Sequence, residues 1–246
     1  MSGIYLWIED RRGKSSHTFW SVLMNQLYPD VIVESKKNNS ELVKVVKSLE
    51  DSKNRYMIIF DNSFDNQQIY QERKILKKYI DRKENVWLID IICFEYILLE
   101  FDRLLEWIYA PDDEFLIKRS RVIRAREKLV ESFQSGEMDY KGIREIVEYD
   151  YNLGHHNVEQ LSTRILFDLT RNTGFEVSKG VIGECWIMSC CDWSEREEDD
   201  ICGLDGDRLS LYEKMKCIYH GTSLCRKLSD IGLEVWRSGH DYYLQA

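Results

Sequence analysis

Acidic side chains follow three short apolar runs in the first third of the chain. Glu9 comes after the run Ile4–Ile8, Asp61 after 56–60 and Asp90 after 86–89. Carboxylate oxygens are the ligands that hard cations such as Mg²⁺ and Mn²⁺ prefer. A bound ion of this kind stabilises the charge that develops on a phosphate, and it orients or activates an attacking water. The three acids therefore predict a divalent-cation site for phosphodiester chemistry.

The elements that must position these acids alternate between two hydrophobic patterns. Four apolar runs have the length of buried strands: 4–8, 31–33, 56–60 and 86–89. Segments with the apolar spacing of a helix follow them: 17–28, 40–49, 67–81 and 91–109. Uniformly apolar strands that alternate with helices are typical of a parallel sheet covered on both faces. We therefore predict an α/β fold with a mostly parallel sheet and flanking helices for residues 1–110.

The acids are expected to meet because they stand at the same end of their strands. In open α/β sheets the binding crevice lies beyond the carboxyl ends of the strands. The alternative for each acid taken alone is a role as the N-cap of the helix that follows. Three acids from three strands favour the shared site.

Three segments resemble the Toprim domain, which topoisomerases, primases and nucleases of the overcoming-lysogenization-defect type share. They are IYLWIED at 4–10, YMIIFDNSFD at 56–65 and WLIDIICFEYILLEF at 87–101. In that family one strand ends in a glutamate, which Glu9 matches, and a later strand ends in an Asp-x-Asp pair, whose first member Asp61 matches. Glu95 matches the glutamate of a similar stretch in Toprim-like nucleases of some anti-phage systems. The resemblance covers roughly residues 1–105.

The resemblance implies a nuclease that acts on DNA or RNA with Mg²⁺ or Mn²⁺, in bacterial anti-phage defence or a mobile element. It implies that Glu9 is a general acid/base or metal ligand, and that Asp61 is a metal ligand. Asp65 and Asp90 would be further ligands, and Glu95 would orient a ligand or a water. Such nucleases often work beside an ATPase. Because the sequence has no GxxxxGK[ST] motif, that ATPase would be a separate partner chain.

Two positions depart from the family pattern. Asp10 stands where the family usually has glycine, and Ser63 stands at the second aspartate of the pair, with Asp65 as the next acid. A serine is a weak ligand for Mg²⁺. The departures leave open a second interpretation, a binding or regulatory module that keeps the fold without the catalysis.

Residues 118–134 form a predicted linker helix with six basic side chains against two acidic ones. Arg121, Arg124 and Lys128 share one helical face and can follow a phosphate backbone. Lys14, in the loop after Glu9, can neutralise a phosphate. The alternative is a solvated charged face, since the same helix also carries a buried apolar stripe.

Residues 111–246 are predicted to form a mainly helical, cysteine-rich part, which contains this basic helix. Six of the seven cysteines fall between Cys185 and Cys225. Cys185, Cys190 and Cys202 are candidate ligands of a structural zinc, although the second close pair typical of zinc sites is missing. Small buried thiols are the alternative. A zinc-stabilised interaction protein is accordingly a third functional interpretation.

The composition limits the class of protein. Apolar residues make up 43% of the 246, which is enough for a substantial core, and the net charge of −9 argues against nonspecific coating of nucleic acid. No apolar stretch approaches the roughly 18 residues of a membrane span, and the first apolar run is too short for a signal peptide. We expect a cytoplasmic protein that binds nucleic acid and no membrane.

Overall fold

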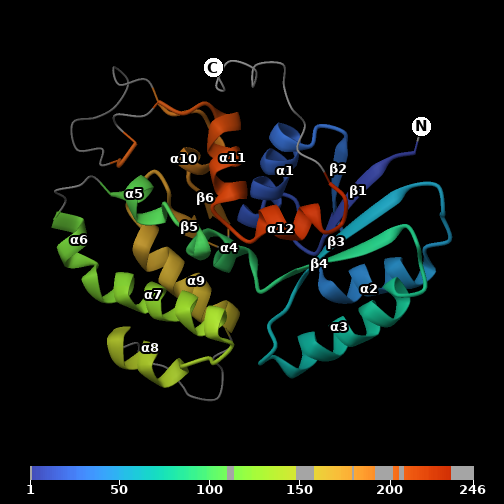
Figure 1. The fold of residues 1–246 in the computed structure, drawn as a ribbon, viewed down its shortest axis with the longest axis horizontal. Coiled ribbons are helices and arrows are strands. Elements are labelled where there is room, and N and C mark those ends of the chain that lie inside the picture. Colours follow the sequence, from blue (N-terminus) through green and yellow to red (C-terminus); the bar gives the residue numbers. More distant parts are fainter. Residues whose placement is uncertain are drawn as a thin grey trace.

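The computed structural model describes residues 2–109, 114–147, 158–178, 180–191, 202–204 and 208–233. Its strands are β1 (Ile4–Ile8), β2 (Val31–Ser35), β3 (Arg55–Asp61), β4 (Val86–Ile91), β5 (Val177–Ser178) and β6 (Val181–Ile182). Its helices are α1 (Ser15–Leu27), α2 (Asn39–Ser48), α3 (Gln67–Ile80), α4 (Phe94–Glu100), α5 (Leu104–Ile108), α6 (Glu114–Lys118), α7 (Ser120–Ser135), α8 (Tyr140–Val147), α9 (Val158–Thr170), α10 (Glu184–Ile187), α11 (Leu211–His220) and α12 (Leu224–Ser229). Figure 1 shows their arrangement. No helix in these ranges is long and apolar enough to cross a membrane.

The main sheet is parallel and has the strand order β2-β1-β3-β4. The prediction of an α/β fold with a parallel sheet is therefore confirmed. β1 pairs with β3 in a register that places Trp7 opposite Ile58, so both strands end at the same edge of the sheet.

Alternate residues of each strand enter two separate cores, because successive side chains of a strand point to opposite faces. In β3, Met57 and Ile59 pack on the face covered by α1 and α4, whereas Ile58 and Phe60 pack against α2 and α3. The sheet is thus the middle layer of three, with α2 and α3 together on one side (Figure 1).

The C-terminal helices join the first of these two cores rather than forming a core of their own. The same buried cluster contains Leu6 of β1, Leu129 of α7, Ile165 of α9 and Ile218 of α11. Elements far apart in the sequence therefore reach the sheet side by side. The boundary predicted between residues 110 and 111 lies outside the described residues.

The single buried helix predicted over 91–109 is wrong, because the structure has two helices there, α4 and α5. The guanidinium group of Arg126 lies at the break and donates hydrogen bonds to the carbonyl oxygens of Leu99 and Phe101, both at 2.8 Å. The backbone N–H of Asp102 donates to Gly221 instead of continuing the helix. These contacts come from distant segments, so the apolar spacing alone does not reveal the break.

Candidate active site

A cavity of about 510 Å³ opens at the carboxyl ends of β1 and β3. Five acidic residues line it: Glu9, Asp10, Asp61, Glu95 and Glu159. From β1 the chain continues to β2 on one side, whereas β3 lies on the other, so the cavity is at the point where the strand order reverses. Ligands of open α/β sheets bind at such switch points.

Glu9 and Asp61 are the two acids that the strands themselves deliver to the cavity. Burial raises the pKa of Glu9 to about 8, and the neighbouring charges of Asp10 and Glu159 add to that effect. Burial also raises the pKa of Asp61 well above its usual value, and repulsion from Glu9 and Glu159 raises it further. Neither side chain forms a hydrogen bond or ion pair with another described residue. The pair therefore lacks a cationic partner within the described part of the chain.

Glu95 belongs to the first turn of α4 and lines the same cavity. Burial raises its pKa to about 7, and repulsion from Glu159 adds to the shift. A hydrogen bond from the Thr163 hydroxyl opposes the shift because it stabilises the carboxylate. Glu95 is thus poised to change protonation near neutral pH.

Glu159 is the acid that the sequence did not identify. It lies in the first turn of α9, and its Oε2 accepts a hydrogen bond of 3.3 Å from the buried hydroxyl of Ser63. An acidic residue in the first helical turn is usually explained by the helix dipole, so the sequence carried no signal of its place in the cavity. The serine that departs from the family pattern therefore holds a carboxylate from another part of the chain.

Asp65 lies beside the cavity but does not line it. Its Oδ2 accepts a 2.8 Å hydrogen bond from the backbone N–H of Val158 and another from the Tyr140 hydroxyl. Asp65 thereby satisfies an N–H group of the first turn of α9, which would otherwise lack a partner. The side chain positions the helix that carries Glu159.

Asp90 is not brought to the cavity either. Arg73 of α3 holds it through two contacts, one from Nε to Oδ1 at 2.9 Å and one from Nη2 to Oδ2. Lys14 occupies the N-cap position of α1 and is also absent from the lining. Of the four acids expected at one ion, the structure brings together Glu9 and Asp61 and separates Asp65 and Asp90 from them.

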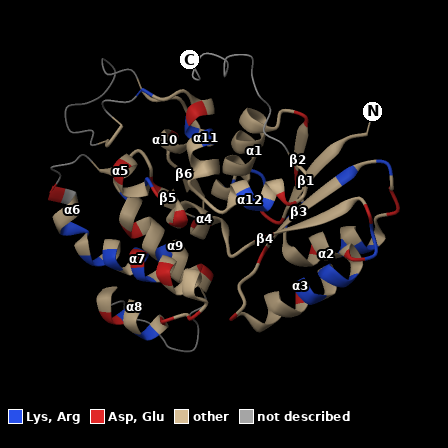
Figure 2. Cartoon of the chain, in the orientation of Figure 1, with Lys and Arg blue, Asp and Glu red and all other residues tan. Residues whose placement is uncertain are grey.

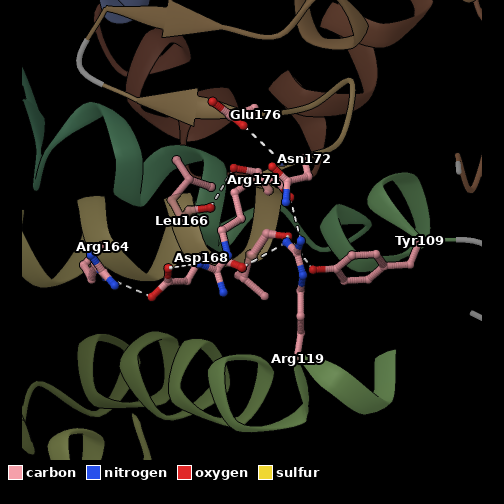
Figure 3. A network of polar contacts seen from close by, with 10 residues as sticks. Tyr109, Arg119, Arg164, Leu166, Asp168, Arg171, Asn172 and Glu176 are labelled. Carbon is pink, nitrogen blue, oxygen red and sulfur yellow. Dashed lines mark hydrogen bonds and ion pairs between the residues drawn. The ribbon is translucent and has the colours of Figure 1, made fainter. Parts of the chain in front are cut away.

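Arg164 contributes positive charge to the cavity lining. Its Nε donates to Asp168 Oδ2 at 2.9 Å, and Figure 3 shows this pair one turn apart on α9. At the end of α9, the buried guanidinium of Arg119 donates to the carbonyl oxygens of Asp168, Leu169 and Arg171. Arg119 therefore fixes the C-terminal end of the helix that carries Glu159 and Arg164.

The basic helix predicted over 118–134 corresponds to α7. Arg121 and Arg124 are exposed on it, while Lys128 forms a 2.8 Å ion pair with Asp139. Arg119 and Arg126 instead bind backbone carbonyl groups inside the protein. Only part of the basic character of this segment faces solvent, and a nucleic-acid role for Arg121, Arg124 and Lys128 stays a prediction.

The cysteines are all free thiols. Burial raises the pKa of the Cys185 thiol to about 11, with a contribution from nearby Cys202. Zinc binds the thiolate rather than the thiol. The zinc site expected from Cys185, Cys190 and Cys202 stays a prediction.

In the described ranges, no set of three or more His, Cys, Asp or Glu side chains is arranged to hold a metal ion unaided. Mg²⁺ usually takes one or two carboxylates, and waters and substrate phosphates complete its ligand sphere. Glu9 and Asp61 fit that requirement, because they are partly buried, Asp61 is repelled by Glu9, and neither has a partner among the described residues. The donor chemistry therefore suits a divalent ion held jointly with a substrate.

Comparisons with protein-family models, with curated proteins and with solved structures find no match to this chain.

Proposed function

We propose that this protein is a metal-dependent phosphodiesterase that cleaves DNA or RNA and uses Mg²⁺ or Mn²⁺. The observation that carries the proposal is the pairing of Glu9 and Asp61 in one cavity at the switch point of a parallel sheet, with no cationic partner in the described ranges. A cation at this place would relieve the repulsion between the two carboxylates. The Toprim resemblance of residues 1–105 supports the same reaction class.

The residues of the cavity have separate tasks in this proposal. A bound divalent ion would supply positive charge to a phosphate and lower the pKa of a water. Glu9 accepts a proton from the attacking water or donates one to the leaving oxygen. Arg164, oriented by Asp168, binds a phosphate oxygen through its guanidinium group. Glu159 adds a further carboxylate to the lining of the cavity.

The wider setting follows from the resemblance alone. A separate ATPase chain as partner, a place in anti-phage defence or in a mobile element, and a cytoplasmic location belong to this proposal. Ser63 motivated the alternative of a module without catalysis. The hydrogen bond from Ser63 to Glu159 favours the catalytic interpretation, because it supplies an acid where the strand itself has none.

The test is a cleavage assay on single-stranded DNA, duplex DNA and RNA, with Mg²⁺, with Mn²⁺ and with a chelator. We compare the wild type with Glu9→Gln, with Asp61→Asn and with the control Asp30→Asn, whose exposed carboxyl lies before β2 at the other end of the sheet. The two cavity variants should lose about 100-fold or more of the metal-dependent rate, the lower range for a lost acid or base. The control should keep the wild-type rate. Equal rates in all four proteins, or no metal-dependent cleavage by the wild type, would contradict the proposal.

A further inference from the structure

The outer face of α3 carries a row of basic side chains above a shallow groove of about 590 Å³. The groove is lined by Tyr70, Arg73, Lys74, Lys77, Lys78 and Arg82, with Asp81 as the acidic member of its lining. Positions 70, 74 and 78 are each four residues apart, so they share one face of α3 at intervals of about 6 Å, and Arg82 follows just beyond the end of the helix at Ile80. Such a row suits an extended chain of negative charges.

Most of these cations have no internal partner. Lys74, Lys77, Lys78 and Arg82 form no ion pair with another described residue. Arg73 differs, because it binds Asp90. The chain as a whole has a net charge of −9, so this basic surface is a local excess, and Figure 2 shows it as blue segments along α3.

The composition of the groove favours nucleic acid over an anionic membrane. A helix that binds a membrane surface turns an apolar face toward the lipid. The apolar face of α3, with Leu76 and Ile80, is already buried against the sheet. Tyr70, half-exposed at 47%, lies at the start of the basic row, where its ring can stack on a base.

The short connection between β3 and α3 links the groove to the edge of the sheet that holds the acidic cavity. α3 begins at Gln67, six residues after Asp61, and Asn66 caps its first turn through hydrogen bonds from Gln68 and Ile69. Glu72, in the same half of the helix, is among the charges that raise the pKa of Glu9. The basic row therefore starts at the carboxyl edge of the sheet and runs away from it along a helix about 20 Å long.

We propose that the α3 groove binds the sugar-phosphate backbone of a nucleic acid strand and leads that strand to the cavity of Glu9 and Asp61. The choice of nucleic acid as ligand rests on the proposed function. The positive row compensates for the repulsion that the acidic cavity exerts on phosphates. Several nucleotides are held by the groove while one phosphodiester lies at the carboxylates.

The experiment measures binding without cleavage. Fluorescence anisotropy of labelled single-stranded DNA and RNA, in a chelator and over a series of salt concentrations, compares three proteins. They are the wild type, the groove variant Lys74→Gln/Lys77→Gln/Lys78→Gln, and a control with the same charge loss, Lys37→Gln/Lys53→Gln/Lys141→Gln. All six lysines are exposed, and glutamine is a good helix former, so both variants should keep the wild-type melting temperature.

The groove variant should bind at least tenfold more weakly than the wild type. Its plot of log affinity against log salt should be shallower by about 2, the amount expected for three lost phosphate contacts on a single strand. The control should bind as the wild type does. Equal binding by wild type and groove variant, or equal losses in both variants, would overturn the proposal. Binding of the wild type to phosphatidylserine vesicles but not to oligonucleotides would overturn it too.

The outcome is separable from that of the cleavage assay. If the groove binds nucleic acid but Glu9→Gln and Asp61→Asn leave cleavage unchanged, the proposed function of the cavity is contradicted and the proposed binding by the groove is supported. If the cavity variants lose cleavage while the groove variant binds normally, the proposed binding by the groove is contradicted and the proposed function of the cavity is supported.

Discussion

The hydroxyl of Ser63 donates a 3.3 Å hydrogen bond to Oε2 of Glu159, and this contact joins the loop after β3 to the first turn of α9. The two residues are 96 positions apart in the sequence. Glu159 thus reaches the cavity from the C-terminal half, beside the acids that the strands deliver. The acidic cavity is built by both halves of the chain.

An aspartate at position 63 should destabilise the protein, although the Toprim pattern has one there. Ser63 is 1% exposed and contacts Glu159, so Ser63→Asp would bury two carboxylates against each other. We expect a loss of about 3 kcal/mol in the free energy of unfolding, measured by urea denaturation. The double variant Ser63→Asp/Glu159→Gln should recover at least half of that loss, because one carboxylate becomes an amide that can donate a hydrogen bond. A stable single variant, or a double variant no better than the single one, would contradict the placement of Glu159.

The stability of the metal-free protein should fall as the pH rises. The pKa of Glu9 is raised from 4.5 to about 8 in the folded state, so the folded protein keeps a proton that the unfolded chain releases across that interval. The contribution of Glu9 to stability is therefore full below about pH 4.5 and is lost by about pH 8. Between pH 5 and 8 we expect a loss of at least about 2 kcal/mol that is absent in Glu9→Gln. Urea denaturation in a chelator at each pH measures it, and parallel pH profiles for the two proteins would contradict the raised pKa of Glu9.

Asp65 should act on the helix α9 rather than as a ligand. Asp65→Ala removes the acceptor of the Val158 N–H and should cost about 1 kcal/mol, the usual effect of losing a helix cap. Asp65→Asn keeps an acceptor oxygen and should cost less. Thermal unfolding of both variants, with and without Mn²⁺, separates the roles. A ligand role would appear as a loss of the stabilisation by Mn²⁺ in both variants, and that result would contradict the structural role.

Arg119 should be a structural residue although it belongs to the basic segment. Its guanidinium is buried and donates to three carbonyl oxygens at the end of α9, as Figure 3 shows. Arg119→Met should lower the free energy of unfolding by about 3 kcal/mol, since it removes the Arg119 donors of the Asp168 and Arg171 carbonyl oxygens, while the Tyr109 hydroxyl still donates to Leu169. Arg119→Lys should restore only part of this stability, because an ammonium group lacks the planar set of donors of the guanidinium group. Nucleic acid binding lost at unchanged stability would contradict this role.

The strand ends were predictable because their signal is local. Apolar runs followed by an acid place Glu9 and Asp61 at the carboxyl edge of a parallel sheet, and both line the cavity. This local pattern gives no information about side chains from elsewhere in the chain that bind these acids. Asp90 has the same local signal, yet Arg73 from the neighbouring helix occupies its carboxylate.

The rest of the cavity depends on how the C-terminal helices pack. Glu159 stands in α9, within the part of the chain predicted to be mainly helical, but contacts of Asp65 and Arg119 from distant segments fix the two ends of this helix. The basic groove of α3 was missed for a related reason. Its charges are as dense as those of α7, and only the structure shows which of the two segments turns its basic side chains inward.

Binding of Mn²⁺, followed by electron paramagnetic resonance, tests the central claim most directly. The wild type should bind one Mn²⁺ per chain, and either Glu9→Gln or Asp61→Asn should weaken that binding at least tenfold, a change of about 1.4 kcal/mol. The control Asp30→Asn should bind as the wild type does. If all four proteins bind Mn²⁺ with the same affinity, or if none binds it, then Glu9 and Asp61 do not form a metal site and the account of the cavity is wrong.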